Sequence, residues 1–145
     1  MLALHTEIQI DATPERVWNI LMDFAGHAQW NPFLRALEGV PRLGETLKVY
    51  IQPPGGRGMQ FRPKVLAVEP ARELRWKGKL FVSGLFDGEH FFLLEQMPNG
   101  SVLFKQGERF TGLLVPLLRK SIQGPTEAGF VAMNEALKRR AEASQ

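Results

Sequence analysis

His90 and Glu108 are the residues of this chain whose types and placement could do chemistry. They lie on opposite sides of the turn Pro98-Asn99-Gly100, each in a stretch where apolar and polar residues alternate. An imidazole oriented by a carboxylate can act as a general acid or base, for example on a carbon beside a carbonyl group. The same pair can also be purely structural, because a buried carboxylate beside an imidazole satisfies both groups without a ligand. Both interpretations stay open from the sequence.

The two alternating stretches predict a hairpin from Phe86 to Phe110. A three-residue loop closed by Met97 and Ser101, with Gly100 in the left-handed conformation, would set its register. Counting back in twos from that loop gives three cross-strand pairs, which are Leu94 with Phe104, Phe92 with Gln106, and His90 with Glu108. His90 and Glu108 would then be direct neighbours on an otherwise apolar face, where they must be satisfied internally or used on a ligand.

The N-terminal part predicts one strand and two helices. Apolar and polar residues alternate from Leu4 to Asp11, which is typical of a strand with one buried face. Thr13, followed by a proline and a glutamate, predicts the cap of a helix that ends near Phe24. A short second helix is expected around Ala25 to Gln29.

The rest of the chain predicts strands and a C-terminal helix. Strands bounded by prolines and glycines are expected at Leu34–Glu38, Glu45–Gln52, Met59–Glu69 and Glu73–Leu80, before the hairpin. The C-terminal helix is expected from Leu113 to Ile122, with an interruption at Gly124-Pro125 and a second stretch capped by Thr126. This α+β order predicts about seven mostly antiparallel strands in one curved sheet around the long terminal helix, with a space between them.

Ten side chains are candidates to line that space and bind a ligand, although each could also belong to the plain core. They are Trp30, Phe33, Trp76, Phe92, Phe104, Gln106, Phe110, Leu114, Leu117 and Met133. The segment from Phe110 to Leu118 is apolar almost all round, so it is either a fixed buried helix or a lid that opens for ligand.

Composition narrows the class of protein. A chain of 145 residues with 44% hydrophobic residues predicts one domain over 1–145. The absence of cysteine excludes disulfides and thiolate nucleophiles and favours a reducing compartment, so we expect a cytoplasmic protein. Since no apolar run approaches about 20 residues, we expect no stable membrane insertion. The net charge of +3 is scattered apart from Lys138 to Arg140, which favours a helix end over a nucleic-acid site. The sequence leaves a homodimer possible.

Other chemistries find little support. The three histidines, His5, His27 and His90, lack the spacing of metal ligands, so we expect no metal and no cofactor. No serine has a histidine near it in sequence, which disfavours a serine hydrolase. The glycines from Gly55 to Gly58 lack the lysine-serine pair of a phosphate-binding loop and are interpreted as a turn at a cavity rim.

A family resemblance rests on five segments in order. They are Ile8-Gln9-Ile10-Asp11-Ala12-Thr13-Pro14-Glu15-Arg16-Val17-Trp18, Trp30-Asn31-Pro32-Phe33, Glu73-Leu74-Arg75-Trp76, Gly88-Glu89-His90-Phe91-Phe92-Leu93-Leu94 and Glu108-Arg109-Phe110-Thr111-Gly112-Leu113-Leu114. In them the chain resembles the helix-grip proteins of the START and birch-pollen-allergen superfamily, often labelled SRPBCC or polyketide cyclase/dehydrase-like. The resemblance covers nearly the whole chain and implies a seven-stranded sheet that grips a long C-terminal helix around a hydrophobic cavity.

The resemblance implies no single activity, because relatives include carriers, aromatase/cyclases and co-chaperones. We expect the protein to bind a small hydrophobic molecule, such as a lipid, polyketide or aromatic metabolite, as a carrier or sensor. The alternative is a cyclase or dehydratase that uses His90 and Glu108 as an acid/base pair. A third hypothesis is a protein-interaction module that uses the exposed face of the sheet.

Overall fold

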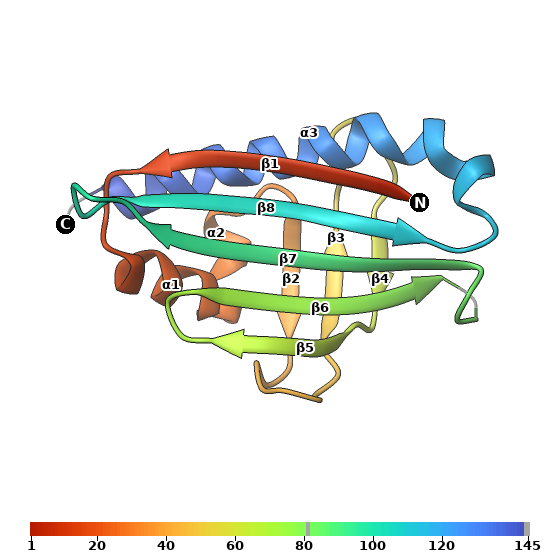
Figure 1. Ribbon diagram of the computed structural model, residues 1–145, viewed down its shortest axis with the longest axis horizontal. Coiled ribbons are helices and arrows are strands. Elements are labelled where there is room, and N and C mark those ends of the chain that lie inside the picture. Colours follow the sequence, from red (N-terminus) through yellow and green to blue (C-terminus); the bar gives the residue numbers. More distant parts are fainter. Residues whose placement is uncertain (81, 144–145) are drawn as a thin grey trace.

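The computed structural model describes residues 1–80 and 82–143 (Figure 1). Its elements, in chain order, are β1 (Leu2–Ile10), α1 (Pro14–Met22), the 3-10 turn η1 (Phe24–Gly26), α2 (His27–Trp30), β2 (Leu34–Glu38), β3 (Lys48–Ile51), β4 (Met59–Phe61), β5 (Lys64–Glu69), β6 (Glu73–Leu80), β7 (Phe86–Gln96), β8 (Val102–Thr111) and α3 (Val115–Glu142). The fold is α+β, as predicted. One antiparallel sheet has the order β1-β8-β7-β6-β5, and a second has the order β2-β3-β4. Helix α3 packs along β1 and β8, with the second sheet behind the first in Figure 1.

The described residues form eight strands rather than seven, because Pro63 interrupts the predicted strand from Met59 to Glu69. Proline has no N–H to donate to a sheet ladder. Strand β4 therefore pairs with β3, and β5 pairs with β6 in the other sheet. The two sheets still meet where the chain before β3 pairs with the start of β5: Leu47 donates to the carbonyl of Pro63, and Val65 donates to that of Glu45, both at 2.8 Å. The expected curved sheet is thus folded over into two layers.

The hairpin of β7 and β8 has the register predicted from the sequence. The amide of Met97 donates to the carbonyl of Ser101 at 2.8 Å, and Gly100 has a φ of 87°. Leu94 lies opposite Phe104, Phe92 opposite Gln106, and His90 opposite Glu108. The turn residues therefore set which side chains of the two strands meet.

Helix α1 begins as its sequence predicts. The hydroxyl of Thr13 accepts a hydrogen bond from the amide of Arg16 at 3.2 Å, and Pro14 occupies the first turn. Val17, Trp18 and Leu21 form its buried face. The helix ends at Met22 instead of near Phe24, because the side chain of Asp23 caps the following 3-10 turn.

The short helix α2 is held by a buried histidine. Nε2 of His27 lies 2.7 Å from the carbonyl oxygen of Leu21, and Nδ1 lies 3.0 Å from Nδ2 of Asn31. The side-chain oxygen of Asn31 accepts hydrogen bonds from the amides of Phe33 and Leu34, each at 2.9 Å. Asn31 therefore turns the chain into β2 and delivers Phe33 to the interior.

Helix α3 is continuous, so the predicted interruption at Gly124-Pro125 and the predicted cap at Thr126 are wrong. Pro125 lies inside the helix and Thr126 is buried within it. Pro125 cannot donate to the carbonyl of Ser121, which normally ends or kinks a helix. Packing prevails here, because the next turns bury one apolar stripe of the helix completely; its members are Phe130, Met133 and Leu137.

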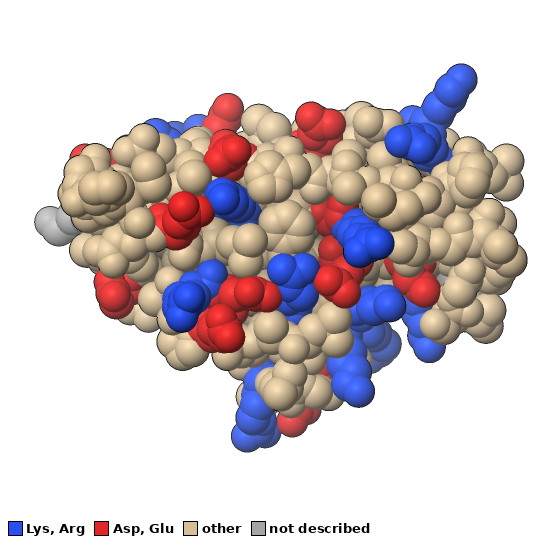
Figure 2. All heavy atoms as spheres, in the orientation of Figure 1, with Lys and Arg blue, Asp and Glu red and all other residues tan. Residues whose placement is uncertain are grey.

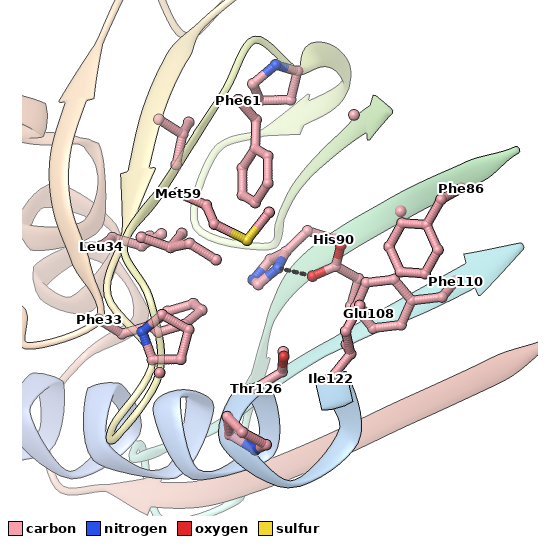
Figure 3. Close-up of a pocket in the computed structure, with 18 of the residues that line it drawn as sticks. Phe33, Leu34, Met59, Phe61, Phe86, His90, Glu108, Phe110, Ile122 and Thr126 are labelled. Atoms are coloured by element: carbon pink, nitrogen blue, oxygen red, sulfur yellow. Dashed lines mark hydrogen bonds and ion pairs between the residues drawn. The ribbon is translucent and has the colours of Figure 1, made fainter. Parts of the chain in front are cut away.

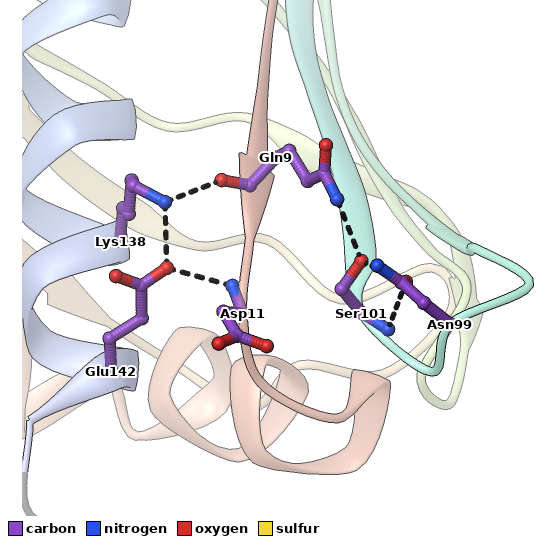
Figure 4. A network of polar contacts seen from close by, with 6 residues as sticks. All are labelled: Gln9, Asp11, Asn99, Ser101, Lys138 and Glu142. Carbon is purple, nitrogen blue, oxygen red and sulfur yellow. Dashed lines mark hydrogen bonds and ion pairs between the residues drawn. The ribbon is translucent and has the colours of Figure 1, made fainter.

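Polar contacts fasten the C-terminal end of α3 to β1 (Figure 4). Lys138 donates to the carbonyl of Gln9 at 2.8 Å and to the carboxylate of Glu142 at 2.7 Å. Glu142 also accepts from the amide of Asp11 at 2.7 Å. The bond from Lys138 and then the bond from Asp11 lower the pKa of Glu142. On the other side of β1, the side-chain amide of Gln9 donates to the hydroxyl of Ser101 in the hairpin loop at 3.0 Å. These contacts hold strand, helix and hairpin in one arrangement.

The outer face of the five-stranded sheet carries mixed charges, as Figure 2 shows. Arg75 bonds both Glu73 at 2.8 Å and Glu89 at 3.0 Å, and its guanidinium lies 5.3 Å from the ring centre of Phe91. Interspersed charges of this kind are typical of a face in contact with water. Among the described helices, none has both the length and the apolar character that crossing a membrane requires.

Candidate ligand-binding site

A pocket of about 290 Å³ lies between the two sheets and the N-terminal half of α3 (Figure 3). This volume is close to the lower end of the range for ligand sites, about 300–1,000 Å³. Its apolar wall combines side chains from the start of β2 and the residue before it, from β3 and β4, from the inner face of β6 to β8, and from α3. The main contributors are Phe33, Val49, Ile51, Met59, Phe61, Trp76, Phe86, Phe110 and Ile122.

Strand alternation directs these side chains inward. On β7, Phe86, Gly88 and His90 face the pocket, while Asp87 and Glu89 face the other side. On β8, Glu108 and Phe110 line the pocket from the adjacent strand. Two residues of α3, Ile122 and Thr126, lie one turn apart and close the pocket from the helix (Figure 3).

The His90–Glu108 pair is the polar feature of this wall. Nδ1 of His90 lies 3.1 Å from Oε1 of Glu108, and Nε2 lies 2.9 Å from Oε1 of Gln106. The His90 side chain is only 4% exposed, whereas that of Glu108 is 18% exposed. Both ring nitrogens are therefore occupied by the protein, and the carboxyl group is the more accessible member of the pair.

Three aromatic rings enclose the imidazole of His90. The ring of Trp76 stacks on it with centroids 5.4 Å apart, and those of Phe92 and Phe130 lie at 4.5 and 5.0 Å. Aromatic faces are favourable neighbours for an imidazole, especially when it carries a proton. The ring is thus fixed in orientation by packing as well as by its hydrogen bonds.

A chain of buried polar groups continues behind His90. Nε2 of Gln106 donates to Oδ1 of Asn134 at 2.8 Å, and Nδ2 of Asn134 donates to the hydroxyl of Thr6 at 2.8 Å. The hydroxyl of Thr6 donates to the main-chain carbonyl of Gln106 at 2.7 Å. This chain brings together β1, β8 and α3 directly beneath the pocket.

The rim of the pocket is positively charged. Arg57 and Lys79 line the pocket and are exposed, and neither has an ion-pair partner among the described residues. Gly56 lines it as well, so the structure places the Gly55–Gly58 turn at the rim, where the sequence predicts it. Inside this rim the wall is mostly apolar, and its polar side chains are those of His90, Glu108, Ser121 and Thr126.

The structure brings five of the twelve predicted site residues together in the pocket. Phe33, Trp76 and Phe110 line the pocket with His90 and Glu108. The other predicted ligand-binding residues lie elsewhere: Phe92, Phe104 and Met133 are fully buried in the core, Gln106 lies beneath His90, Trp30 packs beside His27, Leu114 is partly buried against the core before α3, and Leu117 is 77% exposed. Leu117 belongs to α3 and Leu114 directly precedes it. Both lie within the Phe110–Leu118 segment, for which the sequence leaves a lid or a fixed helix open.

Sequence reasoning missed the wall formed by the second sheet. Val49 and Ile51 of β3 and Met59 and Phe61 of β4 line the pocket. Their alternation marks an inward face, but no local pattern says that this sheet lies across the pocket from β7 and β8. Pro63 was the available signal, since a proline at that position separates β4 from β5.

No group of three or more histidine, aspartate or glutamate side chains in residues 1–80 and 82–143 is arranged to hold a metal ion.

Comparison with solved structures supports the fold. Over 97% of this chain and 93% of the other, the aromatase/cyclase Zhui from Streptomyces sp. R1128 superposes with a TM-score of 0.78 at 15% identity. A protein from Mesorhizobium loti gives a TM-score of 0.76 at 22% identity over 99% of both chains. A START superfamily protein from Mycobacterium smegmatis gives 0.73 at 19% identity over 97% of both. No curated protein sequence matches the chain.

The sequence also matches a family model over residues 1–143, nearly its whole length. That family is described as polyketide cyclase / dehydrase and lipid transport. The match confirms the resemblance found in the sequence segments, and the structure has the helix-grip arrangement that the resemblance implies. The chain is therefore a member of the polyketide cyclase/dehydrase and lipid transport family.

Proposed function

We propose that the protein binds a small hydrophobic molecule, such as a lipid, polyketide or aromatic metabolite, in the pocket between the sheets and α3, as a carrier or sensor. The observation that carries this proposal is the pocket itself, a space of about 290 Å³ with an apolar wall and a partly exposed carboxyl group, that of Glu108. Family membership and the likeness to START and aromatase/cyclase structures support it.

The energetics suit a compact ligand. Removing about 200–300 Å² of apolar ligand surface from water contributes about 5–8 kcal/mol before the costs of ordering. Micromolar affinity follows for a ligand of one or two rings. Glu108 would orient its polar end, and Arg57 and Lys79 would favour a group at the rim that carries negative charge.

A second candidate function is catalysis of the cyclase or dehydratase type. It is favoured by one observation, namely that Glu108 reaches the pocket while His90 holds its other side at 3.1 Å. Such a pair can take a proton from a ligand carbon and deliver a proton to a ligand hydroxyl group, which then leaves as water. Carrier and enzyme use the same pocket and differ in whether the ligand leaves unchanged.

Binding is tested with the neutral probe N-phenyl-1-naphthylamine, whose fluorescence rises in an apolar site. Ile122→Trp places a large ring in the pocket, and Ala128→Trp places the same ring at an exposed position of the same helix. The parent and Ala128→Trp should bind the probe, and Ile122→Trp should bind it at least about tenfold more weakly, since tenfold is only about 1.4 kcal/mol. Equal binding by all three would contradict the proposal.

Carrier and enzyme are separated by mass spectrometry. Native spectra of freshly purified protein should reveal a retained hydrophobic passenger if the protein is a carrier. If it is an enzyme, incubation with that passenger or its precursor should yield a product lighter by one water, and Glu108→Gln should abolish the product while binding persists. If the passenger is recovered unchanged from both the parent protein and Glu108→Gln, the protein is a carrier.

A further inference from the structure

We propose that Thr6 and Asn134 are positioning residues of the site: through Gln106 they keep the proton of the neutral His90 ring on Nε2, so that within the His90–Glu108 pair it is Glu108 that exchanges a hydrogen bond or proton with the ligand. This inference deepens the proposed function. The part of it that concerns the ligand rests on the proposed function. The observation behind this inference is the series of hydrogen bonds from Thr6 to Glu108, in which the direction of each bond determines the direction of the next.

The chain has an unambiguous starting point at a main-chain carbonyl. The main-chain carbonyl oxygen of Gln106 can only accept a hydrogen bond, and the hydroxyl of Thr6 lies 2.7 Å from it. The single hydroxyl proton of Thr6 is therefore used on that carbonyl. The group of Asn134 that lies 2.8 Å from the Thr6 oxygen must then be a donor, which identifies it as the amide nitrogen Nδ2.

The same reasoning passes through two amides to the imidazole. With Nδ2 of Asn134 on Thr6, its oxygen Oδ1 faces Gln106 and accepts from Nε2 at 2.8 Å. The remaining Gln106 atom, Oε1, is an acceptor and lies 2.9 Å from Nε2 of His90. That ring nitrogen must carry a hydrogen, because two acceptors would otherwise face each other in a buried site.

Because Nε2 of His90 carries a hydrogen, the protons and net charge of the His90–Glu108 pair follow. Nδ1 lies 3.1 Å from Oε1 of Glu108, and a hydrogen bond between them needs one proton, on either the ring or the carboxyl group. In both cases the pair is neutral overall. The reversed chain would place the only ring proton on Nδ1 beside an ionised Glu108, and the pair would carry one negative charge. In an apolar pocket the two arrangements differ by a desolvated charge.

Accessibility then divides the roles. His90 is closed in by Trp76, Phe92 and Phe130 and has both nitrogens engaged, whereas Glu108 is 18% exposed. A ligand therefore exchanges a hydrogen bond or a proton with the carboxyl group, and His90 acts through it. A ligand with a neutral hydroxyl or N–H donor at its buried end matches this neutral pair better than an anion does.

The decisive experiment reads the ring protons directly with ¹⁵N-histidine NMR in a Glu108→Gln background. A glutamine at 108 can either donate to Nδ1 or accept from it, so the preference comes from the Gln106 side alone. Spectra are recorded above the pH at which the ring loses its second proton. We expect the Nε2–H form in excess by about tenfold or more, which corresponds to about 1.4 kcal/mol. His27 serves as an internal reference, since its Nε2 donates to the Leu21 carbonyl.

Three further variants in that background test the chain. Thr6→Val removes the anchoring hydroxyl while keeping a β-branched residue in β1, and it should shift the His90 ring toward a mixture of the two forms. Thr6→Ser keeps the hydroxyl and should restore the Nε2–H form. Asn134→Leu removes the next link and should act like Thr6→Val. A purely structural role for these residues would leave the ring protons unchanged.

A predominant Nδ1–H form in the Glu108→Gln protein overturns the proposal, even if no other variant folds. It is also overturned if Thr6→Val or Asn134→Leu folds and keeps the Nε2–H excess. Because this experiment uses no ligand, its failure leaves the pocket-binding proposal standing. Loss of probe binding by the parent protein would remove the proposed function without altering the histidine spectra.

Discussion

The carboxyl group of Glu108 occupies the space that a side chain at Gly88 would fill. A Cβ built at Gly88 would overlap Oε2 of Glu108 and would lie 3.3 Å from its carboxyl carbon. Gly88 is the residue opposite Phe110 in the β7–β8 ladder, so the carboxyl group folds across the neighbouring strand to meet His90. The absence of a side chain at 88 is thus part of the site.

Gly88→Ala should displace the Glu108 carboxyl group from His90. The end of a glutamate is flexible, so we expect a moderate loss of about 1 kcal/mol in unfolding free energy, together with a changed His90 NMR spectrum. Gly78→Ala is the matched control, because Gly78 lies directly opposite Gly88 in β6 and its added Cβ would only reach ordinary contact with Pro63 at 3.6 Å. Stability is measured by urea unfolding, and the His90 signals by NMR. The same stability and the same His90 spectrum in both variants would contradict this account.

Gly129→Ala should destabilise the protein although alanine favours helix. An added Cβ would overlap the ring of Phe33, lying 2.6 Å from Cε1, and the ring lines the pocket. We expect a loss of about 1–3 kcal/mol from overpacking, which exceeds the gain of about 1 kcal/mol in helix propensity. The reverse change at the exposed neighbour, Ala128→Gly, should cost about 1 kcal/mol by propensity alone. A Gly129→Ala protein more stable than the parent in urea would show that the ring moves freely.

The stability of the protein should fall in mildly acidic solution because of His27. Burial lowers the pKa of His27 below its ordinary value of 6.5, while the bond to Leu21 and the charge of Asp23 act weakly against that. Below pH 6.5 the unfolded chain binds a proton that the folded chain refuses. Stability due to this group is therefore complete above pH 6.5 and declines as the pH falls toward the lower folded pKa, by at most about 1.4 kcal/mol per pH unit.

The measurement for His27 is urea unfolding from pH 8 to pH 5 on the parent and on His27→Gln. Carboxylates contribute equally to both proteins, so the difference between the two curves isolates His27. The gap between them should shrink as the pH falls. Parallel curves would mean that the buried ring accepts its proton without cost.

Arg16→Met should loosen the C-terminal end of α3. The Arg16 guanidinium donates to the carbonyls of Ala141 at 2.6 Å and Ala143 at 2.8 Å, which otherwise lack helical partners. We expect a loss of about 1–2 kcal/mol and faster amide exchange in the last turn. Arg72→Met is the control, since that side chain is exposed and has no hydrogen-bond partner among residues 1–80 and 82–143. Similar effects of both changes would indicate a general charge effect instead of capping.

The local parts of the site could be predicted from the sequence. The loop at Gly100 and the period of two determine that His90 lies opposite Glu108 and Phe92 opposite Gln106. Both signals act over a few residues, because turn conformation and strand alternation depend on neighbours in the chain. The start of α1 at Thr13 is predictable for the same reason.

The sequence was a poorer guide to where a strand or helix is interrupted, because a proline has opposite effects in different surroundings. Pro63 ends β4 and sends the chain into the other sheet, whereas Pro125 lies inside a continuous α3. At Pro125 the buried turns that follow retain the helix against the local preference. Such outcomes depend on tertiary packing, which a local pattern does not contain.

The sequence by itself determined the α+β class, the register of the hairpin and the meeting of His90 with Glu108. Tertiary structure alone decided that β3 and β4 form the opposite wall of the pocket and that Thr6 and Asn134, 128 residues apart, bond each other beneath it. The reason is physical: alternation and turn chemistry specify which way a side chain faces, but the partner it meets there depends on how distant elements pack to bury their apolar faces.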